Sequence, residues 1–405
     1  MDLVRKQIRM KLCFPLLSWM VVSLTMTMPS CTAQPKSPLS GHIELNPEWK
    51  SMIYMVKPRH FNEIAADYLG QVIDSASISS DGSFSFNHLP FPASPLLIEL
   101  VVQKKGVRYA NHLSDENPDE ANYMPLVLLP EETVVVDAGL TNFQKSSTIE
   151  NPSPDNQAMI GLRDKRLNAY AILQSELTEE LQDDSLLLEK EDVYVRYRKV
   201  LMDYAQSTGS LEAGMVAIRW VSPTGDFERT PEFLHGQCMK WKEIKPQHPF
   251  TAELCAAADE DALPVMIGDE MPDYTMPLLA GDTMKLSTML GSRMTLIDIW
   301  ASWCAPCRKE NREILAPLWA SYKDKGLQII GYSIDSNGAS WKTAISKDGA
   351  TWTHASHLSG DDSPFMEALR ITTIPANYLL DTNGKVLAKN VFGEELKTLV
   401  TEYLK

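Results

Sequence analysis

The sequence lacks clusters of basic residues, long hydrophobic runs and low-complexity tracts, and these absences narrow the class of protein. Beyond the first dozen residues no block is rich in lysine or arginine, and the formal net charge is −15. Because an acidic surface repels phosphate groups, we expect no nucleic-acid partner. No fixed-period repeat is present, and 44% hydrophobic with 22% charged residues is the composition of a globular protein. A chain of 405 residues is too long for one ordinary core, which predicts two or three domains.

The N-terminus has the features of an export signal over residues 1–33. Basic residues at positions 5–11 precede the apolar stretch LCFPLLSWMVVSLTM, and small residues follow in PSCTAQ. The apolar stretch is short and is interrupted by Pro15 and Ser18, which disfavours a retained membrane anchor. Two processing routes fit: cleavage before Cys31, which leaves a lipid-modified cysteine as an anchor, or cleavage after Ala33, which releases the chain. Both routes place the mature protein in the cell envelope, in the periplasm, where disulfides persist.

Residues 35–150 carry the pattern of a small antiparallel β domain. The stretch VIDSASISSDGSFSFNHL alternates apolar and polar residues on both sides of Asp81-Gly82, which predicts a hairpin. PLLIELVVQ and ETVVVDAG are further short runs of strand-forming residues. We therefore expect a β-sandwich-like domain in this range.

Residues 151–262 have a helical period instead. Apolar side chains recur at helical spacing from Ile160 to Leu181, and the pattern resumes from Tyr194 to Tyr204. At this spacing the tyrosines indicate core packing more than a binding stripe. The stretch DALPVMIGDEMPDYT then has the composition of a linker that leads into a new domain.

Strand-like and helix-like segments alternate over residues 264–405, which predicts an α/β domain. TLIDIWAS and LQIIGYSID are strand-like and flank the helix-like PCRKENREILAPLWASYKDKG. ANYLLDTNGKVLAKNV is a hairpin pattern that turns at Asn383-Gly384, and EELKTLVTEYLK is a closing helix.

Cys304 and Cys307 form the single CxxC motif, between a strand-like and a helix-like segment. A zinc site needs four ligands, and the histidine pair His354 and His357 is weak evidence for one, so we expect neither a metal nor a cofactor. A structural staple across three positions closes almost no loop and would add little stability. Free N–H groups at a helix start favour a thiolate, and Pro306 suits the first helical turn. The motif therefore predicts a redox pair.

Residues 264–405 resemble the thioredoxin superfamily and, within it, the TlpA/ResA-like exported thiol-disulfide oxidoreductases. DIWASWCAPC is similar to the family's active-site strand and turn, and TTIPANYLLDTNGKV to the segment that holds its cis-proline. The resemblance implies a thioredoxin fold, protein disulfides as substrates and a membrane thiol reductase as electron donor. It implies a substrate surface at Trp303, Ala305, Pro306, Ile374 and Pro375. The first domain resembles, more loosely, the β domain that precedes thioredoxin modules in exported proteins of the Bacteroides group.

Two carboxyl groups accompany the cysteine pair as candidate catalytic residues. Asp298 stands six positions before Cys304, where the resemblance implies a buried acid that assists deprotonation of the second cysteine. A carboxyl in an apolar strand is expected to have a raised pKa, which suits proton transfer near neutral pH. Glu310, three positions after Cys307, matches the active-site glutamate of ResA-like proteins; a solvated residue in a charged run is the alternative.

The helix after the motif departs from the family in one position. Five residues after the second cysteine the family usually has a proline that kinks the helix, whereas this chain has Arg312 there and Pro317 five positions later. The departure leaves open where the helix bends.

Two other functions compete with the oxidoreductase. A peroxidase of the same fold needs a hydroxyl residue three positions before its nucleophile and a proline seven before; here these are Ala301 and Ile297. The other competitor is a redox-inactive binding or scaffold protein, which is disfavoured by the joint presence of Cys304, Cys307, Asp298 and Pro375. The direction of electron flow stays open, since Ala305-Pro306 alone does not set a reduction potential.

Cys238 and Cys255 lie in the predicted helical region. In an oxidising compartment we expect a structural disulfide between two helices, with free buried thiols as the alternative. A second catalytic pair is least supported, because neither cysteine stands at a helix start.

Overall fold

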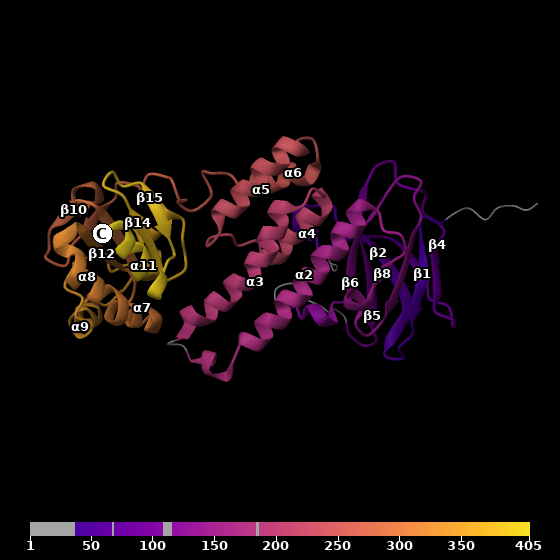
Figure 1. The fold of residues 1–405 in the computed structure, drawn as a ribbon, viewed down its shortest axis with the longest axis horizontal. Coiled ribbons are helices and arrows are strands. Elements are labelled where there is room, and N and C mark those ends of the chain that lie inside the picture. The colour runs from indigo at the N-terminus through magenta and orange to yellow at the C-terminus, as the bar shows by residue number, and fades with distance from the viewer. Residues whose placement is uncertain (1–36, 67–68, 108–115, 184–185) are drawn as a thin grey trace, which may run out of the picture. The chain divides into compact units, whose positions relative to one another are not determined.

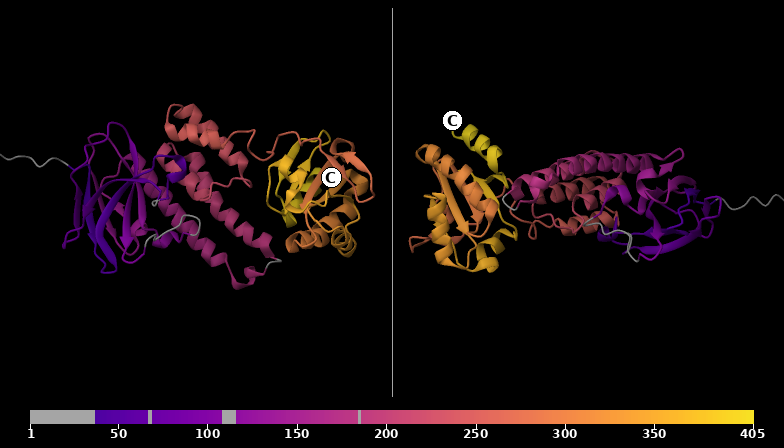
Figure 2. Two further views of the ribbon diagram at one scale, coloured as in Figure 1. Left: turned by 180° about the vertical axis from the view of Figure 1, so that it is seen from behind. Right: turned by 90° about the horizontal axis from the view of Figure 1, so that it is seen from below.

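The computed structural model describes residues 37–66, 69–107, 116–183 and 186–405. Figures 1 and 2 show strands toward the N-terminus, then helices, then a mixed region toward the C-terminus. The predicted export signal, with Cys31, lies outside the described residues. None of the described helices combines the length and the apolar character needed to cross a membrane.

The strands of the first region form two four-stranded sheets. One sheet has the order β4-β1-β7-β8 and consists of β1 (Leu39–Glu44), β4 (Ser83–Phe86), β7 (Val134–Gly139) and β8 (Thr148–Ile149). The other has the order β3-β2-β5-β6 and consists of β2 (Trp49–Lys57), β3 (Gln71–Ser77), β5 (Leu96–Lys104) and β6 (Tyr123–Leu128). Leu39 and Phe86 of the first sheet share one hydrophobic core with Met55 and Leu100 of the second, so the predicted sandwich is present.

The hairpin predicted at Asp81-Gly82 is wrong in its pairing. The turn forms, with Gly82 at φ +86° and its N–H donating to the Ser79 carbonyl. However, β3 and β4 on its two sides belong to different sheets: β4 pairs with β1, and β3 pairs with β2. Alternation fixes which face of a strand is buried and leaves its partner unspecified. A second difference is that β1 and β7 pair in parallel in an otherwise antiparallel domain.

The helices that follow share a core with the outer face of the second sheet. They are α1 (Phe143–Ser146), α2 (Pro154–Glu176), α3 (Leu187–Ser207), α4 (Leu211–Val221), α5 (Pro231–Ile244) and α6 (Pro249–Ala257). Along β5 side chains alternate with period two: Leu97 joins the helical core, whereas Ile98 joins the sandwich core. Tyr197 and Tyr204 pack against the helical core, as expected for core tyrosines. The domain boundaries at residues 150 and 262 stay a prediction.

The C-terminal region has a mixed five-stranded sheet in the order β13-β12-β11-β14-β15. Its strands are β11 (Met294–Trp300), β12 (Leu327–Ser333), β13 (Thr353–Ala355), β14 (Ala376–Leu380) and β15 (Val386–Lys389). Strand β11 is central, parallel to β12 and antiparallel to β14. The predicted hairpin at Asn383-Gly384 is confirmed, because β14 and β15 pair antiparallel and Gly384 has φ +87°. A separate two-stranded ladder joins β9 (Thr275–Pro277) and β10 (Thr283–Lys285).

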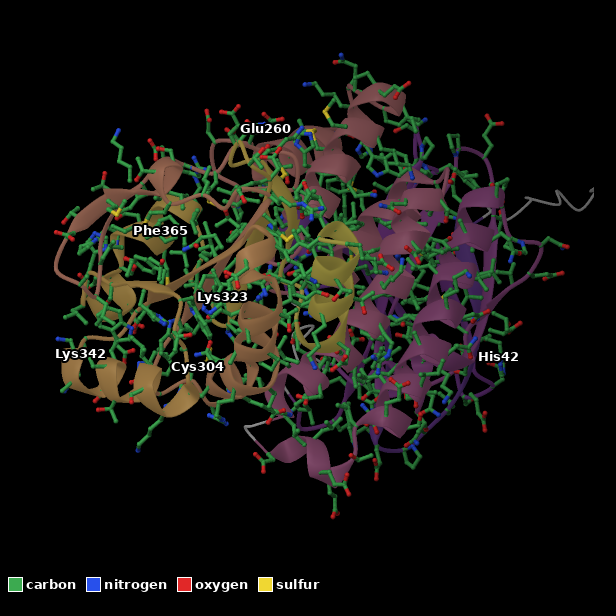
Figure 3. All side chains as sticks on the ribbon, turned by 60° about the vertical axis from the view of Figure 1, so that its left-hand side comes forward. His42, Glu260, Cys304, Lys323, Lys342 and Phe365 are labelled. Atoms are coloured by element: carbon green, nitrogen blue, oxygen red, sulfur yellow. A yellow bond between two sulfur atoms is a disulfide. The ribbon has the colours of Figure 1, made fainter. Side chains whose placement is uncertain are left out.

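Helices supply a core on each face of this sheet, which is the arrangement of the predicted thioredoxin fold. The helices are α7 (Ala305–Glu310), α8 (Ala316–Tyr322), α9 (Gly338–Asp348), α10 (Pro364–Leu369) and α11 (Gly393–Tyr403). Leu318 of α8 and Val400 of α11 pack with Leu296 of β11 on one face. Phe365 of α10 packs with Ile299 on the other (Figure 3). The predicted α/β fold class is confirmed.

Short turns of helix connect several of these elements. Single 3-10 turns occur at Phe61–Glu63, Pro118–Glu120, Glu179–Gln182, Leu286–Thr288, Lys323–Lys325 and Gly360–Asp362. Between α7 and α8 the chain makes one π-helical turn, Asn311–Leu315.

Candidate functional site

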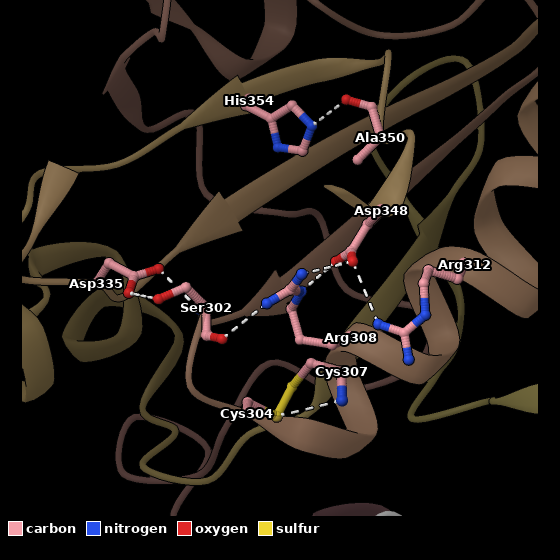
Figure 4. A network of polar contacts seen from close by, with 9 residues as sticks. All are labelled: Ser302, Cys304, Cys307, Arg308, Arg312, Asp335, Asp348, Ala350 and His354. Atoms are coloured by element: carbon pink, nitrogen blue, oxygen red, sulfur yellow. Dashed lines mark hydrogen bonds and ion pairs between the residues drawn. A yellow bond between two sulfur atoms is a disulfide. The ribbon is translucent and has the colours of Figure 1, made fainter. Parts of the chain in front are cut away.

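The CxxC motif lies where the central strand passes into a helix. Strand β11 ends at Trp300, and α7 begins at Ala305, so Cys304 occupies the N-cap position and Pro306 the first turn. The Cys304 sulfur accepts a hydrogen bond from the Cys307 backbone N–H at 3.3 Å. The two cysteines are joined by a disulfide (Figure 4). A sulfur in this position faces N–H groups that the helix leaves unpaired, which stabilise negative charge.

Both cysteines of the motif are buried, whereas Trp303, the residue before it, is exposed. Cys304 is 6% exposed and Cys307 1%, whereas Trp303 is 63% exposed. Ala305 is also exposed, and Pro306 is buried. An exposed indole beside a sparingly accessible sulfur offers an incoming chain apolar contact next to the reacting atom. Cys304 is therefore the more accessible of the two cysteines.

Asp298 is buried in the middle of β11. It pairs with Gly331 on β12 and with Asn377 on β14, and it lies on the strand face of Leu296. Among the described residues its Oδ2 has no hydrogen-bond partner. Burial, and secondly the charge of Glu310, raise the pKa of Asp298 well above its usual value. Asp298 therefore has a higher proton affinity than a solvent-exposed aspartate.

Glu310, the last residue of α7, is buried, unlike the solvated residue of the alternative interpretation. Its Oε1 accepts a hydrogen bond from the Gly393 N–H at 2.9 Å. Burial raises the pKa of Glu310 to about 7, against the lowering effect of the Gly393 bond. A carboxyl with this pKa exchanges its proton at neutral pH, and its charge acts on Asp298.

The predicted cis-proline is present. The Ile374–Pro375 peptide bond is cis, and Ile374 packs against the hydrophobic cluster that contains Cys304 and Cys307. The two residues before Ile374 are exposed, and both of their backbone N–H groups donate to the carboxylate of Glu228, at 2.8 and 3.0 Å. Nothing in the sequence around Glu228 pointed to this contact, because the residues lie more than 140 positions apart.

The helix after the motif bends at the π-helical turn that includes Arg312. Pro317 has no N–H, and its ring clashes with the carbonyl four residues earlier, at Glu313. The wide turn Asn311–Leu315 ends just before α8, which has Pro317 in its first turn. Pro317 thus accounts for the bend at the place where the family has its proline.

Arg308 and Arg312 both bind Asp348, at the end of α9. Arg308 also donates to the Ser302 carbonyl, and Ser302 in turn binds Asp335 (Figure 4). Sequence reasoning missed these partners, because Asp348 lies 40 positions from Arg308. The basic residues after Cys307 indicated that an acidic partner could be present, but the sequence did not identify Asp348 as that partner.

The remaining predicted residues lie elsewhere or have other partners. Cys238 and Cys255 form a disulfide between α5 and α6, in the helical core and away from the cluster that holds the CxxC pair. Burial lowers the pKa of His354 to about 4, and its Nε2 bonds the Ala350 carbonyl, while His357 Nδ1 bonds the Tyr332 hydroxyl.

The two positions that a peroxidase would use are apolar and fully buried. Ala301 and Ile297 have no exposed surface and carry no hydroxyl group. Neither residue supplies a hydrogen bond to a peroxide beside Cys304.

Known proteins match the C-terminal region. The family model described as the AhpC/TSA family matches residues 267–389. Thiol-disulfide oxidoreductase ResA of Bacillus thuringiensis is 28% identical over 148 residues, 36% of this chain and 81% of its own length. Thiol:disulfide interchange protein DsbE of Pseudomonas fluorescens is 26% identical over 133 residues, 31% of this chain and 67% of its own. The solved thioredoxin domain of a thiol-disulfide oxidoreductase from Bacteroides vulgatus is 30% identical and covers 35% of this chain and 99% of that domain, with a TM-score of 0.33. In its C-terminal region the chain thus belongs to the TlpA/ResA-like thiol-disulfide oxidoreductases of the thioredoxin family.

Proposed function

We propose that the chain is an exported enzyme that reduces protein disulfides through Cys304 and Cys307. The observation that carries this proposal is the position of the Cys304 sulfur at the start of α7, with the Cys307 N–H donating to it. In the reduced protein the same N–H and the helix dipole would stabilise the Cys304 thiolate, which is the reactive form of a cysteine.

The reaction begins with attack of the Cys304 thiolate on one sulfur of the substrate disulfide. A Cys304–substrate disulfide forms, and the other substrate sulfur leaves as a thiolate that takes up a proton. Cys307 then gives up its proton and attacks the Cys304 sulfur, which releases the second substrate thiolate and forms the Cys304–Cys307 bond. The substrate gains the two electrons that the cysteine pair loses. A dithiol of a membrane thiol reductase would return them.

Asp298 is the proposed acceptor of the Cys307 proton. Its raised pKa brings its proton affinity nearer to that of a thiol than an ordinary aspartate's would be, which eases transfer of the Cys307 proton. Glu310 tunes this transfer, since its negative charge raises the pKa of Asp298 further. The two carboxyl groups would therefore titrate together.

The substrate chain would lie across Trp303, Ala305, Pro306, Ile374 and Pro375. Exposed Trp303 supplies apolar area, and Ile374 and Pro375 would supply backbone groups to an extended chain. We place this activity in the periplasm on the pattern of residues 1–33, with a lipid anchor at Cys31 as one of the two forms of the mature protein.

Reduction of insulin disulfides by the full mature chain tests the proposal. With dithiothreitol as the dithiol, we expect the wild-type protein to accelerate insulin reduction and Cys304→Ser to match the rate without protein. A folded wild-type protein that gives no acceleration would contradict the assignment.

The reduction potential of the Cys304–Cys307 pair tests the direction. A reductant should have a potential near that of thioredoxin, about −270 mV, and not near that of the oxidant DsbA, about −120 mV. Equilibration with dithiothreitol, followed by thiol labelling, measures it. A potential near that of DsbA would contradict the proposed direction and would indicate an enzyme that forms disulfides.

A further inference from the structure

Ser302, two residues before Cys304, forms hydrogen bonds with two residues, Asp335 and Arg308 (Figure 4). Its backbone N–H and its hydroxyl donate to the two carboxylate oxygens of Asp335, at 2.8 and 2.5 Å. Its carbonyl accepts from Arg308 Nη1 at 3.1 Å. The turn that connects β11 to the CxxC motif is thereby held from the sheet side by Asp335 and from the helix side by Arg308.

Arg308 is itself held by a buried carboxylate. Its Nε and Nη2 donate to the two oxygens of Asp348, the latter at 2.6 Å. The Asp348 side chain is fully buried, and the Arg308 side chain is 19% exposed. A guanidinium bound through two nitrogens has a fixed plane, so the direction of the third nitrogen, Nη1, is fixed as well.

We propose that Arg308 is the positioning residue of the Cys304 thiolate. Clamped by Asp348, it holds the Ser302 carbonyl and so keeps the Cys304 sulfur in place at the start of α7, within reach of the Cys307 N–H. Arg308 contacts no reacting atom and acts through Ser302. This role rests on the proposed function and adds a residue that neither the CxxC motif nor its two carboxyl groups include.

Arg312 offers a matched control. It binds the same Asp348 carboxylate through Nη1 at 3.2 Å, and its side chain is 47% exposed. Within the described part of the chain Arg312 makes no hydrogen bond to Ser302. Removing either arginine takes one positive charge from α7 or the turn after it and leaves Asp348 with the other arginine. Because Asp348 keeps a partner, neither change leaves a buried charge unpaired, and both variants should fold.

The test measures the reactivity of Cys304 in the full mature chain with Cys307→Ser as background. Iodoacetamide modifies only the thiolate, so its rate against pH gives both the thiol pKa and the reactivity of the sulfur. We expect Arg308→Gln to slow modification at pH 7 at least about fivefold and to raise the midpoint of the profile, since a displaced sulfur loses its N–H partner. Arg312→Gln should stay within about twofold of the background protein.

Arg308→Lys separates geometry from charge. Lysine keeps the positive charge and lacks the planar fork, so we expect it to resemble Arg308→Gln. Equal slowing in Arg308→Gln and Arg312→Gln, no slowing in either, or a wild-type profile for Arg308→Lys would each overturn the proposal. Modification does not depend on turnover, so this outcome is separate from failure of the insulin assay, which would reject the proposed function instead.

Discussion

The two disulfides of this protein have the same bond in very different surroundings. Cys304–Cys307 closes a separation of three residues at a helix start, and the strand before it and the helix after it each contain a carboxyl group with a raised pKa. Cys238–Cys255 closes a separation of seventeen residues, and both of its cysteines lie inside helices, α5 and α6. Inside a helix the backbone N–H groups are already bonded to carbonyls, so nothing there favours a thiolate. The comparison teaches that the surroundings of a disulfide, more than the bond, decide whether it exchanges.

The first prediction concerns the two cysteines of the exchanging pair and has the largest effect. Cys307→Ser should accumulate mixed disulfides with envelope proteins, because nothing inside the chain then resolves the Cys304–substrate bond. Cys304→Ser should lose all reductase activity without trapping partners, because Cys307 is almost fully buried. Non-reducing gels of envelope extracts measure both. Adducts that appear with Cys304→Ser alone would reverse the order of attack.

Removing the other disulfide should act on stability alone. In the chain-entropy estimate a loop of seventeen residues gives a disulfide about 3 kcal/mol, roughly twice the value for three residues. We expect the double variant Cys238→Ala/Cys255→Ala to lower the free energy of unfolding by about 3 kcal/mol in urea titrations. Its insulin-reduction rate should stay within about twofold of wild type. A folded double variant without reductase activity would mean that this pair also takes part in exchange.

Asp298→Asn tests the proposed proton transfer from Cys307, which has no counterpart at the Cys238–Cys255 disulfide. At neutral pH the variant should resolve the mixed disulfide about tenfold more slowly, since asparagine does not accept the Cys307 proton. The initial attack by Cys304 should change little, because the helix start stabilises that thiolate. Single-turnover kinetics at several pH values separate the two steps. Equal slowing of both steps would contradict the assigned role.

Glu310→Gln should change how stability depends on pH. The folded protein raises the pKa of Glu310 from 4.5 to about 7, so it holds this proton more tightly than the unfolded chain does. Stability from this group is therefore complete below about pH 4.5 and falls as the pH rises toward 7. Glutamine does not ionise, so relative to wild type the variant should gain about 2.5 kcal/mol between pH 5 and pH 8. Thermal unfolding at the two pH values measures this gain, and a parallel decline in both proteins would exclude it.

The features that the sequence predicted are those that neighbouring residues determine. Cys304, Pro306 and Cys307 lie in one turn, and a hydrophobic strand followed by this turn is visible without any partner. Asp298 was identified from the family resemblance, by its place six positions before Cys304, and its apolar neighbours predicted the raised pKa. The hairpin at Asn383-Gly384 was predicted because its two strands are adjacent in the sequence and pair with each other.

The features that were missed depend on partners far along the chain. The Asp81-Gly82 turn was recognised, but the sheet that receives β4 is set by β1, more than 35 positions earlier. Likewise, the arginines after Cys307 read as a charged helix surface, and only the fold brings Asp348 to them. A local pattern fixes which side of an element is buried, whereas long-range pairing is decided by packing of the whole domain.

The π-helical turn Asn311–Leu315 acts as a one-residue insertion within a continuous helix. Each residue advances an α-helix by about 100°. The extra residue of the wide turn therefore changes, by the same angle, the direction in which all later side chains of the helix point. Pro306 and Cys307 before the turn, and Leu315 and Leu318 after it, are all buried, although one uninterrupted helical phase would not align both sets equally well. In an evolutionary comparison of this helix, gaps would therefore be expected at residues 311–315. Deleting one residue there would replace the π-helical turn by an α-helical one and leave both halves of the helix facing their cores.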